Sequence, residues 1–142
     1  MTDTDIALKR MWHRRISGPD FEKPAQVVQW MGAVQAQDYG QALWAVALRT
    51  VAATQADIEQ AIAERSIVLT WPMRGTLHLV TASEVRWLLE LCASRKLAAD
   101  GSRLRQLELD EPILGRCTEV LSRALEGGKV LTRSGAALLW PP

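Results

Sequence analysis

Amide side chains that could orient a water molecule are concentrated in one short string, Gln35-Ala36-Gln37-Asp38. An amide dipole can orient water and stabilise developing positive charge, but glutamine does not accept a proton at neutral pH. Residues two apart on a helix point about 200° away from each other. Gln35 and Gln37 therefore share one pocket only if the helix ends before them or the backbone extends. Asp38 and Gly40 favour such an end.

Taken by residue type alone, two glutamines beside a helix end are solvated or capping groups in most proteins. Asp38 is the rival candidate for a general base because it adjoins Gln37. Its position is more typical of a carboxylate that closes a turn or caps a helix. Chemistry at this string therefore needs support from elsewhere in the sequence.

Composition limits the classes of protein that this chain can be. With 142 residues, of which 48% are hydrophobic and 23% charged, the chain is long enough for one domain and a fragment of another. Lys and Arg number 17 against 16 Asp and Glu, so no whole-molecule field attracts nucleic acid. Any DNA binding must come from local clusters of charge.

Targeting and metal-binding signals are missing from the pattern. The first residues, Thr2-Asp3-Thr4-Asp5, do not form a basic flank followed by an apolar core, and no run approaches the roughly 18 apolar residues of a membrane span. We expect a cytoplasmic protein without a membrane partner. Cys92 and Cys117 lie in helical apolar patterns, which predicts two buried thiols and no metal site.

The periodicity predicts four helices in the first half of the chain. The first covers 5–16, with an apolar stripe and a basic face. Its stripe is Leu8, Met11, Trp12 and Ile16, and its basic face is Lys9, Arg10, Arg14 and Arg15. The second starts near Pro24 with Val27, Trp30, Met31 and Val34 buried, the third contains Leu43, Trp44, Ala47 and Leu48, and the fourth follows the capping box Thr54-x-x-Asp57.

A hairpin follows these helices. The β-prone runs 67–71 and 76–80 are joined through Pro72-Met73-Arg74-Gly75, a turn signal. Helices followed by a hairpin are the order of a winged helix, so the predicted fold is mainly α with a small β-hairpin. His78 shares a strand face with Thr76 and is expected to be a hydrogen-bonded structural histidine.

The remaining residues predict helices but no second hairpin. One helix begins at the capping box Thr81-x-x-Glu84, runs to about Lys96 and is interrupted at 100–102. Another runs from Glu111 to the Gly127-Gly128 pair, and Thr132 or Ser134 caps a short last one. We therefore divide the chain into a winged-helix unit at 1–100 and, at 101–142, a connecting segment with the incomplete start of a second unit of a tandem array.

Candidate DNA contacts lie outside the glutamine string. Arg74 at the tip of the predicted wing could contact phosphate or enter a minor groove, and Arg10 and Arg14 could contact phosphate from the first helix. Trp71 and Trp140 could stack on a base or a partner, whereas core packing is the first explanation for the other tryptophans. The fourth helix has an acidic polar face, which disfavours ordinary major-groove docking.

The string Leu69-Thr70-Trp71-Pro72-Met73-Arg74-Gly75-Thr76-Leu77-His78-Leu79-Val80, together with Gln35-Ala36-Gln37, resembles the signature of the winged-helix family that contains the AlkZ and YcaQ type alkylpurine DNA glycosylases. The resemblance spans roughly residues 5 to 135 and identifies the chain as similar to the N-terminal portion of the Gln-x-Gln subgroup. It implies that Gln35 and Gln37 line the site where water breaks the N-glycosidic bond of an N7-alkylated purine in double-stranded DNA.

The resemblance also implies catalysis without a metal or organic cofactor, and a substrate range of labile cationic lesions that includes N7-linked interstrand crosslinks. Members of the family are usually more than twice as long and combine three winged-helix units. Two alternatives stay open: a non-catalytic winged-helix regulator, and a truncated interaction remnant that self-associates through the helix from Glu111 to Glu126.

Overall fold

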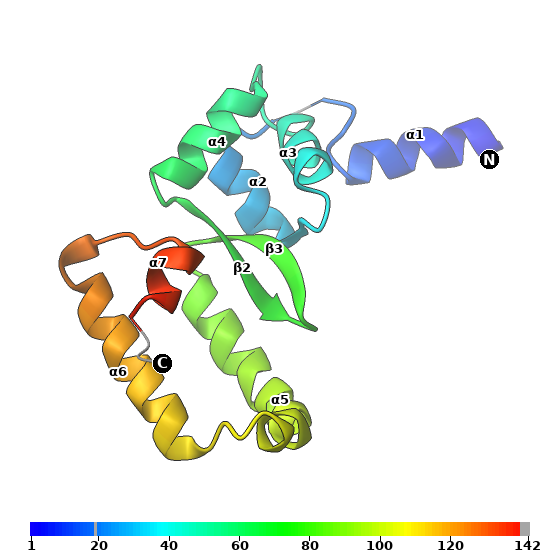
Figure 1. Ribbon diagram of the computed structural model, residues 1–142. Coiled ribbons are helices and arrows are strands. Elements are labelled where there is room, and N and C mark those ends of the chain that lie inside the picture. The colour runs from blue at the N-terminus through cyan, green and yellow to red at the C-terminus, as the bar shows by residue number, and fades with distance from the viewer. Residues whose placement is uncertain (19, 140–142) are drawn as a thin grey trace. The chain divides into compact units, whose positions relative to one another are not determined.

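The computed structural model describes the backbone of residues 1–18 and 20–139, and the side chains of these residues except 93–99. The chain divides into two compact units, Met1–Lys96 and Leu97–Pro142. In the first unit, helices α2, α3 and α4 lie over the strands β2 and β3 (Figure 1). This arrangement is the winged helix that the sequence predicts.

Helix α1 (Asp3–His13) starts and ends earlier than the predicted range 5–16. Thr2 and Asp5 form a capping box that starts the helix, and Arg15, with φ 52°, lies beyond its end. The predicted apolar stripe is not buried, because Leu8, Met11 and Trp12 are all exposed. The period of the sequence therefore predicted the helix correctly but not its burial.

Helix α2 (Pro24–Met31) begins at the predicted proline and ends at Gly32. Gly32 has φ +74°, a conformation that glycine adopts without strain, so it ends the helix before Asp38 and Gly40. Val34 is buried as predicted but belongs to a strand, β1 (Val34–Gln35). Trp30 and Met31 were predicted to be buried and are exposed.

Helices α3 (Tyr39–Ala47) and α4 (Gln55–Ala63) complete the helical layer. They pack against each other and against α2. Their fully buried side chains join those of α2 and the sheet in one core, in which the largest are Val27, Val28, Leu43, Val46, Ile58, Ile67 and Leu79. The core lies between the helices and one face of the sheet.

The three strands form an antiparallel sheet in the order β1, β3, β2. Strands β2 (Ile67–Met73) and β3 (Thr76–Thr81) are joined by a two-residue turn, Arg74 and Gly75, in which both residues have positive φ, as a type I′ turn requires. A bulge lies between Thr70 and Met73, so the strand continues through Pro72 to the turn. Proline is tolerated there because β2 is an edge strand.

The predicted capping box of α4 is present, and it should make the stability of the protein depend on pH. The Asp57 carboxylate accepts from the hydroxyl and from the backbone N–H of Thr54, both at 2.7 Å, and the first of these hydrogen bonds contributes most to lowering the pKa of Asp57. This stabilisation is complete above the ordinary carboxyl pKa of about 4 and is lost as the pH falls below it. Asp57→Ala should therefore lower the melting temperature at pH 7 but not at about pH 3.

Circular dichroism melts at pH 7, 5 and 3 measure this difference. Glu59→Ala on the same helix is the matched control, because among the described residues the Glu59 side chain bonds only the exposed Gln55 amide. A difference between wild type and Asp57→Ala that is constant across the three pH values would contradict the capping role.

Helix α5 (Val85–Gln106) departs from its prediction at both ends. Thr81 ends strand β3, and its hydroxyl bonds the Glu84 carboxylate within a turn, so the helix begins after the predicted capping box. The helix also continues past Lys96 and through Gly101. A helical glycine costs only about 1 kcal/mol relative to alanine, which the surrounding helix formers outweigh.

The last elements are α6 (Glu111–Leu125), the short 3-10 helix η1 (Glu126–Gly128) and α7 (Arg133–Ala137). As predicted, α6 ends at the glycine pair and Thr132 caps α7. Cys92 and Cys117 are free thiols, although they are half-buried where full burial was predicted. Within the described residues, no helix is both long and apolar enough to span a membrane.

Candidate functional site

Gln35 and Gln37 lie on the same side of one extended segment. Val34 and Ala36 are buried in the core, while the alternating Gln35 and Gln37 are exposed. Residues two apart in an extended chain point to the same face. Gln35 and Gln37 can therefore share a pocket, because the preceding helix ends at Gly32 and the backbone after it is extended.

The side chain of Gln37 extends the pairing of β1 with β3. Ala36 N–H donates to the carbonyl of Leu77 at 2.8 Å, and Leu77 N–H donates to Gln37 Oε1, also at 2.8 Å. The side-chain carbonyl thus takes the place that a backbone carbonyl would occupy in a longer strand. This contact holds the Gln37 amide in one orientation and leaves its NH₂ group as a donor.

Asp38 caps the next helix. Its Oδ1 accepts from the backbone N–H of Gln41 at 3.0 Å, and it is the N-cap of α3. The structure confirms the helix-end interpretation of this carboxylate. Gln41 was not singled out in the sequence, although its place three residues after a capping aspartate marks it as a residue of the first helical turn.

These side chains surround an open depression of about 320 Å³. It is lined by Gln35, Gln37, Asp38, Gln41, Ala42 and Ala45. Within the described part of the chain, the Gln35 side-chain amide has no hydrogen-bond partner, so both its carbonyl and its NH₂ group are available to a ligand. The depression therefore places the fixed amide of Gln37 beside the free amide of Gln35.

The other predicted site residues lie outside the lining of this depression. Arg74 is exposed at the turn between β2 and β3, where the sequence placed it, and Trp71 is 56% exposed on the edge strand. Arg10 and Arg14 are exposed at the end of α1. The structure therefore brings the two glutamines together and keeps the basic and aromatic candidates apart from them.

Arg49 connects α1 to α3 and was not found from the sequence. It is only 8% exposed, and its guanidinium donates to the carbonyl of Arg14 at 2.9 Å and to the carbonyl of Ala45. Burial lowers the pKa of Arg49, and the nearby charge of Arg14 lowers it further. The backbone position of Arg14 is thereby fixed relative to α3.

His78 has the structural role that the sequence predicted. It is buried, it lies opposite Gln35 in the register of β1 and β3, and its Nδ1 is 2.8 Å from the carbonyl of Thr76. A carbonyl only accepts hydrogen bonds, so Nδ1 carries the proton. This contact orders the residues that follow the wing turn.

Four tryptophans that were predicted to be core residues, Trp12, Trp30, Trp44 and Trp87, are each more than 40% exposed. Trp71, which the sequence left open for stacking, is also exposed. Trp140 lies outside the described residues. The core is instead filled by valine, leucine, isoleucine and alanine.

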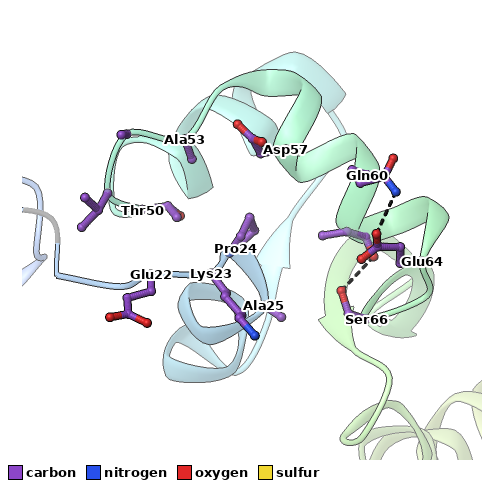
Figure 2. A pocket seen from close by; sticks show the side chains of 13 residues that line it. Glu22, Lys23, Pro24, Ala25, Thr50, Ala53, Asp57, Gln60, Glu64 and Ser66 are labelled. Atoms are coloured by element: carbon purple, nitrogen blue, oxygen red, sulfur yellow. Dashed lines mark hydrogen bonds between the residues drawn. The ribbon is translucent and has the colours of Figure 1, made fainter.

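A second cavity, of about 460 Å³, lies between the start of α2 and α4 (Figure 2). Its charged lining consists of Glu22, Asp57, Glu64 and a single lysine, Lys23. Figure 2 shows the amide of Gln60 bonded to Glu64 at the rim, at 2.7 Å. An acidic cavity repels phosphate, so it is a weaker candidate for nucleic acid than the glutamine depression.

Comparisons with known proteins support the winged-helix fold and identify a family. The model of the family described as DNA glycosylase AlkZ-like matches residues 28–137. An interstrand DNA cross-link repair glycosylase of Streptomyces sahachiroi is 35% identical over 109 residues, which are 77% of this chain and 29% of that protein. The solved structure of Streptomyces sahachiroi DNA glycosylase AlkZ superposes with a TM-score of 0.74 and 33% identity, over 91% of this chain and 34% of the other.

This chain thus spans about a third of the length of the two relatives. The family match includes the glutamine string, the hairpin and α6, whereas α1 precedes it. Because the matched residues make up most of the chain, it belongs to the AlkZ-like DNA glycosylase family.

Proposed function

We propose that this chain carries the catalytic centre of a DNA glycosylase that hydrolyses the N-glycosidic bond of N7-alkylated purines in duplex DNA. The observation that carries the proposal is the pair of amides, Gln35 of β1 and Gln37 just after it, that line one depression, with the Gln37 carbonyl fixed by Leu77 N–H. Family membership supports a DNA substrate. The catalytic roles of the two glutamines rest on this geometry and on the motif.

The proposed reaction matches the chemistry of amides. A purine alkylated at N7 is already cationic, so it leaves as a neutral base when the bond between C1′ and N9 breaks and N9 keeps the electron pair. Water adds to C1′ of the oxocarbenium-like sugar, and one water proton passes to solvent. Gln35 orients the water with its carbonyl, whose negative end also stabilises the positive charge on the sugar, and the NH₂ group of Gln37 donates a hydrogen bond that positions the water or the DNA.

The chemistry of the leaving group sets the proposed substrate range. Glutamine cannot protonate a neutral base, so lesions that are not cationic are poor substrates. The Streptomyces sahachiroi relative is described as a repair glycosylase for interstrand DNA crosslinks. Crosslinks attached through purine N7 are cationic at the same position and belong to the proposed class.

Release of the damaged base tests the proposal. The chain is incubated with a duplex that carries one radiolabelled N7-methylguanine, and the free base is separated and counted. The proposal expects base release above the spontaneous rate, and none from a duplex with an intact neutral guanine. Duplex binding without any release would contradict it and would favour a DNA-binding protein without catalysis.

Arg74 is proposed to contact the DNA backbone from the wing turn. It is exposed, and the positive φ of Arg74 and Gly75 holds the turn in a defined shape. We expect Arg74→Ala to weaken duplex binding and to reduce the slope of log affinity against log salt by about 1. Fluorescence anisotropy across a salt series measures both, and an unchanged slope would remove the phosphate contact.

Arg10 and Arg14 are proposed as further phosphate contacts from α1, and Trp71 as a contact from the edge strand. Arg49 supports the first part of this proposal, because it fixes the end of α1 to α3. The acidic face of α4 argues against a regulator that reads the major groove with that helix. Its Asp57 and Glu64 face the cavity of Figure 2.

A further inference from the structure

Gln41, Ala42 and Ala45 of α3 line the glutamine depression, and of these only Ala42 belongs to the core. Trp44 does not line the depression, but it lies beside Gln41 on the helix surface, since residues three apart are neighbours there. The opposite side of α3 supplies Leu43 and Val46, which are fully buried. The core therefore uses the side of α3 that carries Leu43 and Val46. Gln41 and Trp44, on the outer side, are exposed.

Trp44 presents a large aromatic face to solvent. It is 61% exposed, and within the described residues its ring has no aromatic or cationic partner. Trp12 and Trp30 differ in this respect, because Trp12 contacts His13 and Trp30 contacts both Phe21 and Arg15. Trp44 is thus a free stacking surface beside Gln41, which lines the depression.

Gln41 offers a free amide on the same side. Its backbone N–H is taken by Asp38, but within the described residues its side chain has no hydrogen-bond partner. A side-chain amide presents donors and an acceptor together, which is what the polar edge of a purine requires. Gln35 and Gln37 line the same depression as Gln41 of α3. The other α3 residues in the lining, Ala42 and Ala45, have small side chains.

The size of the depression fits one base. Its volume of about 320 Å³ is close to the lower end of the range for small-molecule pockets, about 300 to 1,000 Å³. Enzymes that act on a base draw it out of the stack and hold it by hydrogen bonds to its edge and by stacking on aromatic side chains. On the outer side of α3, Gln41 can form the hydrogen bonds and Trp44 can provide the stacking surface.

We propose that Trp44 and Gln41 hold the alkylated purine against the catalytic glutamines, with Trp44 stacked on its face and Gln41 bonded to its edge. This inference rests on the proposed function of the same site. A cationic purine gains from the indole face both stacking and a cation–π attraction, which a neutral purine lacks. Trp44 is therefore a specificity residue for cationic bases, and Gln41 is a positioning residue.

Equilibrium binding to an uncleaved lesion tests the inference separately from catalysis. The probes are two duplexes of the same sequence, one with 2′-fluoro-N7-methylguanine, in which the fluorine slows bond cleavage, and one with 2′-fluoroguanine. The quantity measured is the ratio of the two affinities. The variants are Trp44→Ala, Gln41→Ala and Trp44→Phe, with Trp12→Ala as the matched control, since Trp12 is about equally exposed but belongs to α1, which contributes no residue to the lining of the depression.

We expect Trp44→Ala and Gln41→Ala each to reduce the preference for the alkylated duplex by about tenfold. Trp44→Phe should keep most of the preference, and Trp12→Ala should keep all of it. Both α3 side chains are solvent-facing, so circular dichroism melts should match wild type.

Two results would overturn the inference. If both alanine variants keep the wild-type preference while wild type releases base, α3 does not recognise the base and the proposed function stands. If wild type itself shows no preference, the inference is again wrong, and the release assay with N7-methylguanine decides the proposed function independently.

Discussion

Gln35→Ala is expected to lower the single-turnover rate of base release by about 10²-fold, in line with the loss of one preorganised group at a developing charge. Gln35 is exposed, and within the described residues its side-chain amide bonds no protein group, so its removal leaves the fold unchanged. Duplex affinity should stay within about twofold, because the amide acts on the transition state rather than on the bound duplex. Quench-flow release of N7-methylguanine and anisotropy give the two values.

Gln37 supplies the matched variants for this prediction. Gln37→Ala should abolish release, but it additionally removes the acceptor for Leu77 N–H. Gln37→Glu keeps an acceptor at that position and replaces the NH₂ group by a charged carboxylate oxygen. If Gln35→Ala released base at the wild-type rate while Gln37→Ala did not, Gln35 would be a neighbour of the site and not a catalytic group.

Leu79→Ala is expected to destabilise the first unit by about 2 to 5 kcal/mol, through lost burial and the cavity left behind. Leu79 is fully buried on β3 and pairs with Val34 of β1 on one side and Leu69 of β2 on the other. The substitution removes contacts from every strand of the sheet. Urea unfolding measured by circular dichroism gives the loss as a lower midpoint.

Leu8→Ala on α1 is the control for this effect. Leu8 is exposed, so its truncation should change the free energy of unfolding by less than about 0.5 kcal/mol. Equal losses for the two variants would mean that α1 is buried against another surface and that the core is not where the structure places it.

The short-range signals in the sequence were sufficient for the starts of α2, α4 and α6 and for the wing turn, but not for the start of α5. Capping by Thr54 with Asp57 and the Arg74-Gly75 turn depend on residues within a few positions of each other, so the sequence predicts them directly. Asp38 as a cap is of the same kind. The position of Arg74 at the wing tip follows from the turn alone.

The parts of the site that depend on distant residues could not be predicted. Strand β1 has two residues, Val34 and Gln35, and it forms because β3 pairs with it. The hydrogen bond from Leu77 N–H to the Gln37 side chain joins residues that are 40 positions apart in the sequence. The buried Arg49 likewise bonds Arg14, from which it is 35 positions away. Local periodicity contains no information about either contact.

Apolar periodicity predicted burial incorrectly for the tryptophans of the helices. The tryptophans on α1, α2 and α3 lie on helical stripes, and the residues of the core are nevertheless Val, Leu and Ile. Trp44 shows the difference most clearly, because a residue assigned to the core is 61% exposed, three residues after Gln41 of the candidate site.

The domain arrangement beyond the first unit stays a prediction. Residues 101–142 contribute α6 and α7, and the chain spans about a third of its relatives. We propose, as the sequence indicates, that these residues begin a second winged-helix unit. Association that depends on concentration would support the alternative that this segment pairs with another copy.

The most direct test of the account compares Asp38→Asn with Gln35→Ala in single-turnover release of N7-methylguanine. Asparagine is as good an N-cap as aspartate, so Asp38→Asn removes the negative charge and keeps the start of α3. If the amides perform the chemistry, Asp38→Asn should retain the wild-type rate within about twofold and Gln35→Ala should lose about 10²-fold. Loss of release in Asp38→Asn with full activity in Gln35→Ala would assign the reaction to a carboxylate base and contradict the account.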